Sequence, residues 1–316
     1  MPLRFVLSRL LELAIVLFGV SLIVFLMIRL IPGDAVAIML GANTEVTPDR
    51  IAELRGRLGL DRPIVEQYLR WIGAALKGDL GVSIWTGRPV LGEIAAHATP
   101  TLQLATLSLL VGAGLSIPAG VLMAQWRGQR ADSILRIITV IGLTTPSFWL
   151  GIVLILMTAA IAPQIPTLGY TPFLEDPLGN VTRLILPAIA LGFPILAYLS
   201  RLVRSAMLDA LAQDYIRTAR AKGLSERRVV YKHALRNALI PFVTSLGVMA
   251  GYLLGGAIVV EQVFAIPGMG RLILGAISER NYPLVQASIL VVTCAFVVIN
   301  AVIDMLYVII DPRLRP

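Results

Sequence analysis

Long apolar runs separated by shorter charged segments dominate the sequence. Six runs lie near residues 10–30, 101–124, 134–162, 184–204, 239–262 and 284–310. Each is long enough to cross the hydrocarbon core of a bilayer, which takes about 20 apolar residues in a helix. The pattern predicts an all-α polytopic membrane protein with six transmembrane helices. The first run lacks an A-x-A-like cleavage site before Pro32, so we interpret it as a retained anchor rather than a signal peptide.

Basic residues mark one side of the predicted membrane domain. Nine lie between Arg201 and Arg236, and others lie before the first run, after the last run and around Arg130. Because short cytoplasmic segments are enriched in Lys and Arg, both termini are expected in the cytoplasm. The predicted divisions are an N-terminal tail with helix 1 (1–30), an external helical segment between helices 1 and 2 (31–100), a permease domain (101–310) and a cytoplasmic tail (311–316).

The external segment contains residues typical of the starts and ends of two short helices. Thr47-Pro48-Asp49 resembles a helix start, and Gly59 can end that helix. A second helical pattern follows Pro63, with an apolar face that contains Tyr68 and Trp71. These helices could form a packing collar or a dedicated substrate site, and we favour the collar. The external face could also bind a soluble partner.

The basic segment Asp214–Arg228 lies between the fourth and fifth runs, within a coupling loop placed at 205–236. Asp214 can cap a helix from Tyr215 to Lys222, and Gly223 can adopt the left-handed conformation that ends it. Ser225 can cap a second helix through Arg236. A passive connection would not need caps, so we interpret this segment as a docking site for another protein.

Small residues recur at helical spacing inside two runs. Gly247, Gly251 and Gly255 lie four residues apart in the fifth run, and a stripe of Ser108, Gly112, Ser116 and Gly120 occurs in the second. Such stripes let helix backbones approach closely. Packing within the chain and a contact with another subunit both fit the pattern. The prolines at positions 118, 146, 187 and 194 are expected to bend helices or free carbonyl groups.

Charged residues inside the runs are few. Asp304 lies one helical turn after Asn300 in the last run, and Glu261 lies near the outer end of the fifth. An acid within a membrane span is a functional candidate, so Asp304 could serve a stand-alone ion-coupled carrier. A lone acid without a second buried titratable partner is a poor proton relay. The favoured role of Asp304 is therefore structural, as a hydrogen bond to a neighbouring span or a position near the cytoplasmic interface.

Composition excludes several other classes. Hydrophobic residues make up 57% of the chain and charged residues 15%, and the mean hydropathy is +0.83. The net charge of +8 lies at the ends of apolar runs, which argues against nucleic-acid binding. The single cysteine, Cys294, and two histidines do not suggest a metal site, and Ser83, His97 and Asp79 are too scattered for a catalytic site. The chain has no Gly-Lys dipeptide and hence no phosphate-binding P-loop, so any ATP must bind another polypeptide.

The segment from Asp214 to Gly223 resembles the EAA loop of integral membrane permeases in the dipeptide, oligopeptide and nickel branch of ABC importers. Further matching strings occur in the expected order at Arg29–Asp34, Gly78–Gly81, His233–Pro241, Glu261–Gly270 and Asp311–Arg313. One position departs from the wider superfamily, because Arg217 stands where the loop usually has glutamate. A mechanism that relies on that glutamate should not be carried over.

The resemblance implies a non-catalytic permease subunit in a prokaryotic inner membrane, without a cofactor. Its expected partners are a second permease, two ABC-type ATPase subunits and an extracytoplasmic solute-binding protein. The segment would act as a coupling helix seated in an ATPase cleft through Asp214, Tyr215, Arg217, Thr218, Ala219, Arg220, Lys222 and Gly223. Dipeptides, longer peptides, nickel chelates, opines and glutathione-like molecules would all be compatible substrates.

Overall fold

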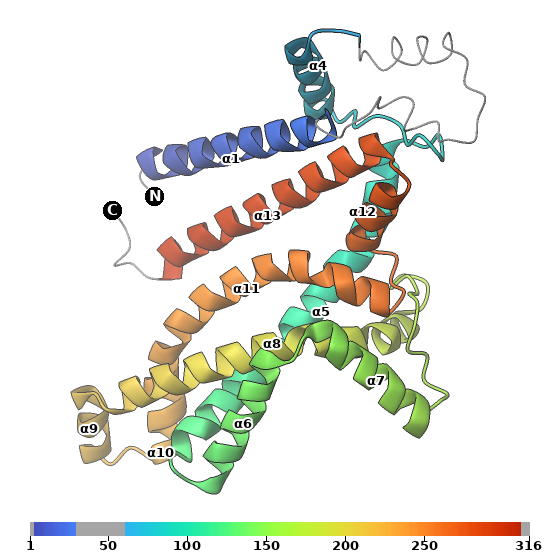
Figure 1. Cartoon of the computed structure of the whole chain (residues 1–316). Helices are drawn as coiled ribbons and strands as arrows, with labels where there is room; N and C mark the ends of the chain where they lie inside the picture. Colours follow the sequence, from blue (N-terminus) through green and yellow to red (C-terminus); the bar gives the residue numbers. More distant parts are fainter. Residues whose placement is uncertain (1–2, 30–60, 311–316) are drawn as a thin grey trace. The chain divides into compact units, whose positions relative to one another are not determined.

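A computed structural model describes residues 3–29 and 61–310 of the chain, and this part is built from helices (Figure 1). Its one β-bridge joins Val82 and Pro89. The helices are α1 (Leu3–Arg29), α4 (Ile64–Leu76), α5 (Val90–Gln125), α6 (Arg130–Thr144), α7 (Ser147–Ile161), α8 (Pro177–Leu211), α9 (Asp214–Ala221), α10 (Glu226–Arg228), the π-helix η1 (Val229–Ala234), α11 (Leu235–Val263), α12 (Met269–Ser278) and α13 (Tyr282–Ile310).

The all-helical membrane architecture is confirmed at a coarse level. Within the described residues, four helices are long and apolar enough to cross a membrane, or five if the bent pair α6–α7 forms one span. The described apolar part of α1, Leu11–Met27, is shorter than these candidates. The short helix α12 was not predicted. Its residues lie between the fifth and sixth apolar runs and are too few to cross a membrane, so they were not assigned to any helix.

The third predicted span, 134–162, is not one continuous helix. α6 and α7 meet at an angle of 109°, at a break formed by Thr145 and Pro146. Pro146 has no backbone N–H to continue the helix, and its ring disfavours the helical conformation of Thr145, which has ψ 122°. By contrast, Pro187 and Pro194 lie inside the unbroken helix α8.

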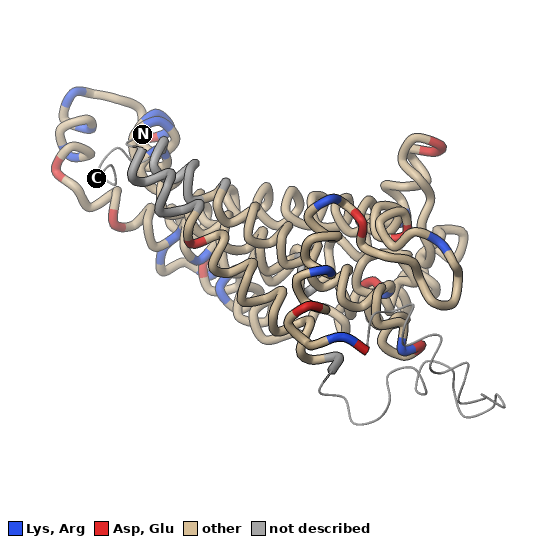
Figure 2. Tube along the Cα trace, turned by 90° about the horizontal axis from the view of Figure 1, so that it is seen from above, with Lys and Arg blue, Asp and Glu red and all other residues tan. Residues whose placement is uncertain are grey.

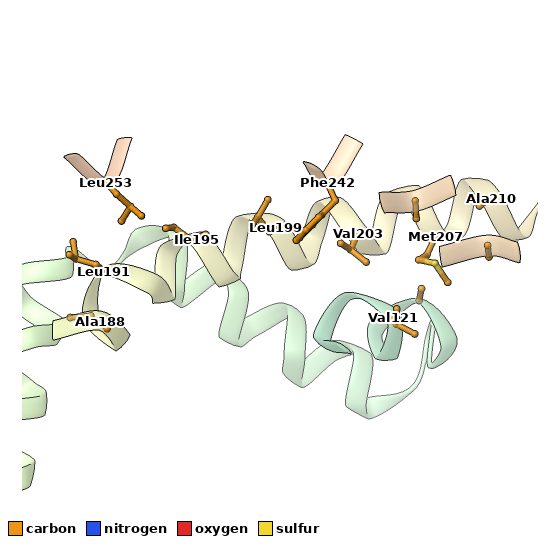
Figure 3. Packing of buried hydrophobic residues seen from close by; sticks show 14 of the residues in the cluster. Val121, Ala188, Leu191, Ile195, Leu199, Val203, Met207, Ala210, Phe242 and Leu253 are labelled. Carbon is orange, nitrogen blue, oxygen red and sulfur yellow. The ribbon is translucent and has the colours of Figure 1, made fainter. Parts of the chain in front are cut away.

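The chain falls into two compact units. Unit 1 contains Met1–Thr99 and Arg271–Val298, and unit 2 contains Pro100–Gly270 and Ile299–Pro316. In unit 2, α8 lies in the middle and contacts α6, α7 and α11. Its buried face carries apolar side chains at every third or fourth position, which is the spacing of one helix face: Ala188, Leu191, Ile195, Leu199, Val203, Met207 and Ala210. Figure 3 shows this row together with Val121 of α5 and with Phe242 and Leu253 of α11.

Glycines let α5 and α6 come close to α8. A Cβ atom on Gly112 would lie 2.7 Å from the carbonyl oxygen of Gly192, and one on Gly120 would lie 2.6 Å from Cβ of Val203. Gly142 of α6 approaches Ala197 in the same way. The stripe predicted in the second run is therefore a packing surface within the chain, with Ser108 and Ser116 fully buried beside these glycines.

In unit 1, α4 packs on α1 through aromatic residues. α4 begins at Ile64, directly after Pro63, where the second external helix was predicted. The hydroxyl groups of Tyr68 and Ser21 lie 2.8 Å apart, and the rings of Tyr68 and Trp71 both lie against Phe25. The packing of Tyr68 and Trp71 on a hydrophobic helix favours the collar interpretation of this part of the external segment.

The turn after α4 is held to the segment before α13, also within unit 1. Asn281 Nδ2 donates to Ser83 Oγ at 2.8 Å, and Trp85 Nε1 donates to the carbonyl oxygen of Glu279 at 2.7 Å. Both Ser83 and Asn281 are buried. Ser83 therefore has a structural partner rather than a catalytic one.

Several predictions lie outside the described residues. They are the helix expected between Thr47 and Gly59, the string Arg29–Asp34 after its first residue, the string Asp311–Arg313, and the surroundings of the Asp304 side chain.

The glycine contacts generate a stability prediction with a control on the same helix. Gly112→Ala should destabilise the protein by about 1–3 kcal/mol, because the added methyl group overpacks the α5–α8 contact. Gly114→Ala should be neutral or stabilising by up to about 1 kcal/mol, because no atom lies within 4 Å of its Cβ position and Ala favours helix. Thermal unfolding in detergent would measure both. Equal midpoints for the two variants would contradict the packing described above.

Candidate functional site

The helix predicted in the basic segment is present as α9, but it starts one residue earlier than expected. Gln213 is its N-cap residue, with an extended backbone, and Asp214 is the first residue of the helix. The prediction that Asp214 caps the helix is therefore wrong. The carbonyl oxygen of Gln213 accepts from Ile216 N at 3.1 Å, and the Asp214 carboxylate lies 3.5 Å from Arg217 Nη1. Asp214 still places a negative charge in the first turn, where the helix dipole favours it.

The predicted stop at Gly223 is confirmed, although the helix ends at Ala221 and Lys222 is the C-cap residue. Gly223 has φ +76°, the left-handed conformation. Its N–H donates to the carbonyl oxygen of Arg220 at 2.9 Å, and the N–H of Leu224 donates to that of Ala219 at 3.3 Å. This pair of bonds is a Schellman motif, which satisfies carbonyl groups that the helix end would leave free.

One face of α9 is buried in the core of unit 2. Ile216 and Ala219 are 0% and 7% exposed, and they belong to the same apolar cluster as the buried face of α8. Their neighbours include Val229, Val230 and Ala234 of η1. An isolated helix of this length would not be stable in water, so this burial is what holds α9 as a helix. Ala219, expected at an interface with another protein, instead packs within the chain.

The opposite face of α9 is exposed and basic. Arg217, Thr218, Arg220 and Lys222 are all exposed, as is Gly223. Arg220 forms a two-bond ion pair with Glu226, at 2.6 Å and 3.0 Å, and the Glu226 carboxylate raises the pKa of the Arg220 guanidinium. Figure 2 shows basic residues, with acidic ones among them, on the end of unit 2 that carries this helix.

Tyr215 links α9 to the start of α11. Its hydroxyl oxygen accepts a hydrogen bond from Asn237 Nδ2 at 2.7 Å, while the side chain remains 40% exposed. Thr218 donates through Oγ1 to the carbonyl oxygen of Asp214 at 3.0 Å. The exposed face is therefore fixed in position by contacts at Tyr215 as well as by the buried face.

The second helix predicted in this segment does not end at Arg236. α10, η1 and α11 follow one another without a loop, so the helix that starts at Glu226 continues to Val263. Ser225 holds the N-cap position without a side-chain hydrogen bond, and its carbonyl oxygen accepts from Val229 N at 3.1 Å. Val229, Val230 and Ala234 are buried, so the apolar face of α11 continues into the basic segment. This continuity explains why the helix does not end at Arg236.

Glu261 has a role that its sequence position did not reveal. The residue is fully buried, and its carboxylate accepts from Thr101 Oγ1 at 2.6 Å and from Gly270 N at 2.8 Å. Thr101 Oγ1 also accepts from Met269 N at 2.8 Å. A Cβ atom on Gly268 would collide with the carboxylate, which accounts for glycine there. The string Glu261–Gly270 thus fastens the end of α11 to α5.

The predicted glycine stripe of α11 has two different environments. Gly247 and Gly251 are buried, whereas Gly255 is exposed and no atom lies within 4 Å of its Cβ position. The exposed side chains of Val248, Tyr252 and Val259 lie on the same side of the helix as Gly255. Gly255 therefore has no packing role within the described part of the chain.

Comparison with known proteins gives a consistent result along the whole length. Residues 116–316 match the family model described as "Binding-protein-dependent transport system inner membrane component", and residues 2–106 match the model of its N-terminal part. The chain is 41% identical over 314 residues to the glutathione transport system permease protein GsiC of Escherichia coli K12, covering 99% of both chains. The GsiC protein of Shigella dysenteriae is equally similar, with 41% identity and the same coverage.

A solved structure shares the fold at lower identity. An inward-facing crystal structure of the MetNI methionine ABC transporter aligns with a TM-score of 0.56 and 19% identity, over 69% of this chain and 96% of that one. At 19% identity this similarity shows only a shared fold. The family of the chain is shown by the family models and by the GsiC relatives.

The Schellman motif predicts the effect of substitutions at Gly223. Gly223→Ala should destabilise the end of α9 by about 1–2 kcal/mol, because an L-residue with a Cβ is strained in the left-handed conformation. Gly223→Asn should cost less, because asparagine tolerates this conformation. Hydrogen exchange of the amides from Ala219 to Leu224 would report the loosening. Faster exchange in the asparagine variant than in the alanine variant would contradict this explanation.

Proposed function

From the premise that the chain belongs to the binding-protein-dependent transport system inner membrane component family, we propose that α9 transmits ATPase movement to the membrane helices. Family membership makes the chain a non-catalytic permease subunit of an ABC importer in the inner membrane. It works with a second permease, ATPase subunits and a solute-binding protein. The stand-alone carrier considered from Asp304 is not the function of this family.

The proposed topology is the six-helix arrangement with both termini in the cytoplasm. Its support is the distribution of basic residues, nine of which lie between Arg201 and Arg236. In this arrangement α9 lies in the cytoplasm, and residues 31–100 form the external segment, which contains α4. The divisions 1–30, 31–100, 101–310 and 311–316 follow from the same topology.

The single observation that carries the coupling proposal is the two-sided character of α9. Its inner face is buried in the core of unit 2 through Ile216 and Ala219. A displacement of α9 would therefore be transmitted to α8 and α11 instead of being absorbed by a flexible loop. Its outer face offers the exposed side chains of Arg217 and Lys222, which suit the acidic rim of a cleft. Arg217 makes a long contact within its own helix, 3.5 Å to the Asp214 carboxylate. Asp214, Tyr215, Thr218, Arg220 and Gly223 shape this face, whereas Ala219 supports it from within.

A second part of the proposal concerns the contact between the two permeases. The supporting feature is the open, exposed position of Gly255 beside Tyr252 and Val259 on α11. Because lipid tails are as apolar as these side chains, helices associate in a bilayer where small residues allow close contact. Gly255 would admit a partner helix, while Gly247 and Gly251 keep α11 close to its own chain.

We infer that the substrate is a small peptide-like solute, such as glutathione or a short peptide. The support is the 41% identity to glutathione transport permeases over nearly the full chain. Selectivity in such systems is shared with the solute-binding protein, which is a separate chain.

Charge reversal on the outer face of α9 tests the coupling proposal. Arg217→Glu together with Lys222→Glu should weaken ATPase binding about tenfold or more, because two favourable charge pairs of up to about 1 kcal/mol each become repulsive. Co-purification of the ATPase subunits and substrate-stimulated ATP hydrolysis would measure the effect. Arg130→Glu is the control, because Arg130 is also basic and exposed but lies on α6. Equal losses in the control and the double variant would argue against a specific role for α9.

Reconstitution tests the substrate class. The complete complex with its solute-binding protein should take up labelled glutathione or a dipeptide into proteoliposomes in an ATP-dependent manner. The permease chain alone, given a proton gradient and no ATPase, should show no uptake. Gradient-driven uptake by the chain alone that is lost in Asp304→Asn would favour the carrier instead.

A further inference from the structure

We infer that the ion pair between Asp132 and Arg204 is a positioning clamp. It would make the C-terminal part of α8, the turn between α5 and α6, and the start of α6 move as one rigid body when α9 moves. This inference rests on the proposed coupling function of α9. Neither residue stands out in the sequence, because nothing local pairs an acid at the start of one apolar run with an arginine at the end of the next.

The Asp132 carboxylate is the centre of the clamp. It lies in the first turn of α6 and its side chain is 1% exposed. Arg204 Nε donates to Oδ1 and Nη2 donates to Oδ2, both at 3.0 Å. This two-bond arrangement fixes the direction of the guanidinium as well as its distance. A single hydrogen bond or a lysine could not fix both.

The same carboxylate also holds the turn between α5 and α6. The backbone N–H of Gly128 donates to Oδ2 at 3.1 Å, and Gly128 itself has φ +78°. Three segments, the α5–α6 turn, α6 and α8, therefore meet at one buried side chain. Arg136 lies farther away, at 3.6 Å from Oδ1, and its side chain is 52% exposed.

The surroundings of the clamp leave little room for sliding. Val203, next to Arg204, meets Gly120 of α5, and Ala197 meets Gly142 of α6 on the same face of α6 as Asp132. The clamp is close to the end of α8 from which α9 follows after Ala212 and Gln213. A displacement of α9 that moves α8 would therefore carry α6 along, and with it the bend to α7 at Pro146.

A buried ion pair is suited to holding α6 and α8 in one geometry. The apolar contacts around the clamp restrict sliding through their shape alone, whereas the two hydrogen bonds of the ion pair also fix the direction of the Arg204 side chain. A buried carboxylate that loses its arginine is left with an uncompensated charge, so partial opening is strongly unfavourable. The clamp thus gives the junction one defined geometry that persists through the transport cycle.

The first test removes both charges at once. The double variant Asp132→Asn with Arg204→Gln should still assemble with the ATPases, because no buried charge is left unpaired. The amount of substrate transported per ATP hydrolysed should fall about tenfold, within the usual range of coupling energies. Arg204→Lys, which keeps the charge but cannot form both bonds, should show a smaller loss in the same direction. Arg201→Gln is the matched control, because Arg201 is exposed on α8 one turn before Arg204, and it should keep the ratio of the unaltered chain.

The second test needs no change in the clamp. Spin labels at Ile137→Cys on α6 and Gln213→Cys beside α9, in a Cys294→Ser background, would report the distance between the two elements. Ile137 and Gln213 are both exposed. The distance should be the same without nucleotide and with ATP trapped in the complex. A distance that changes between these states would overturn the inference, as would an unchanged transport-to-hydrolysis ratio in the double variant.

These outcomes can be separated from a failure of the proposed function. If α9 does not couple to the ATPases, the double variant Arg217→Glu with Lys222→Glu will keep ATPase co-purification and substrate-stimulated hydrolysis. If only the clamp inference is wrong, that double variant will lose both activities, and the clamp variants will match the Arg201→Gln control.

Discussion

Close packing around α8 is the constraint on which unit 2 depends. One face of this helix is buried along most of its length, and glycines of α5 and α6 bring neighbouring backbones against it. Lipid tails are as apolar as these side chains, so burial between helices brings little hydrophobic gain within a bilayer. Cohesion there comes from many short van der Waals contacts, which need matched surfaces. A methyl group added at Gly112 or Gly192 would therefore disturb the whole arrangement.

The same packing explains how a helix as short as α9 can serve as a lever. Ile216 and Ala219 extend the core of α8 into the basic segment, and η1 closes it from the other side. The Schellman motif at Gly223 ends the helix with its carbonyl groups satisfied. Rigid attachment on one face and basic side chains on the other are the two properties that a coupling helix requires.

Local signals in the sequence predicted the elements, but not their long-range partners. The left-handed Gly223, the helix after Pro63 and the apolar runs follow from backbone preferences and periodicity, which act within a few residues. A bend at Pro146 was expected from the same preferences, but the continuous apolar run was still predicted as one span rather than as two helices at 109°. The partners of Asp132 and Glu261 lie far along the chain, so only the folded structure reveals them. Likewise, the direction in which Ala219 faces depended on the position of η1.

The central claim is that the exposed face of α9 contacts an ATPase subunit. Site-specific photo-crosslinking in the assembled importer tests it most directly, with a photoreactive residue at exposed Thr218 and, as a control, at Leu174, which is 95% exposed in the segment before α8. We predict a crosslink to an ATPase subunit from position 218 and none from position 174. An assembled, ATP-hydrolysing complex with no crosslink from position 218 would contradict the claim.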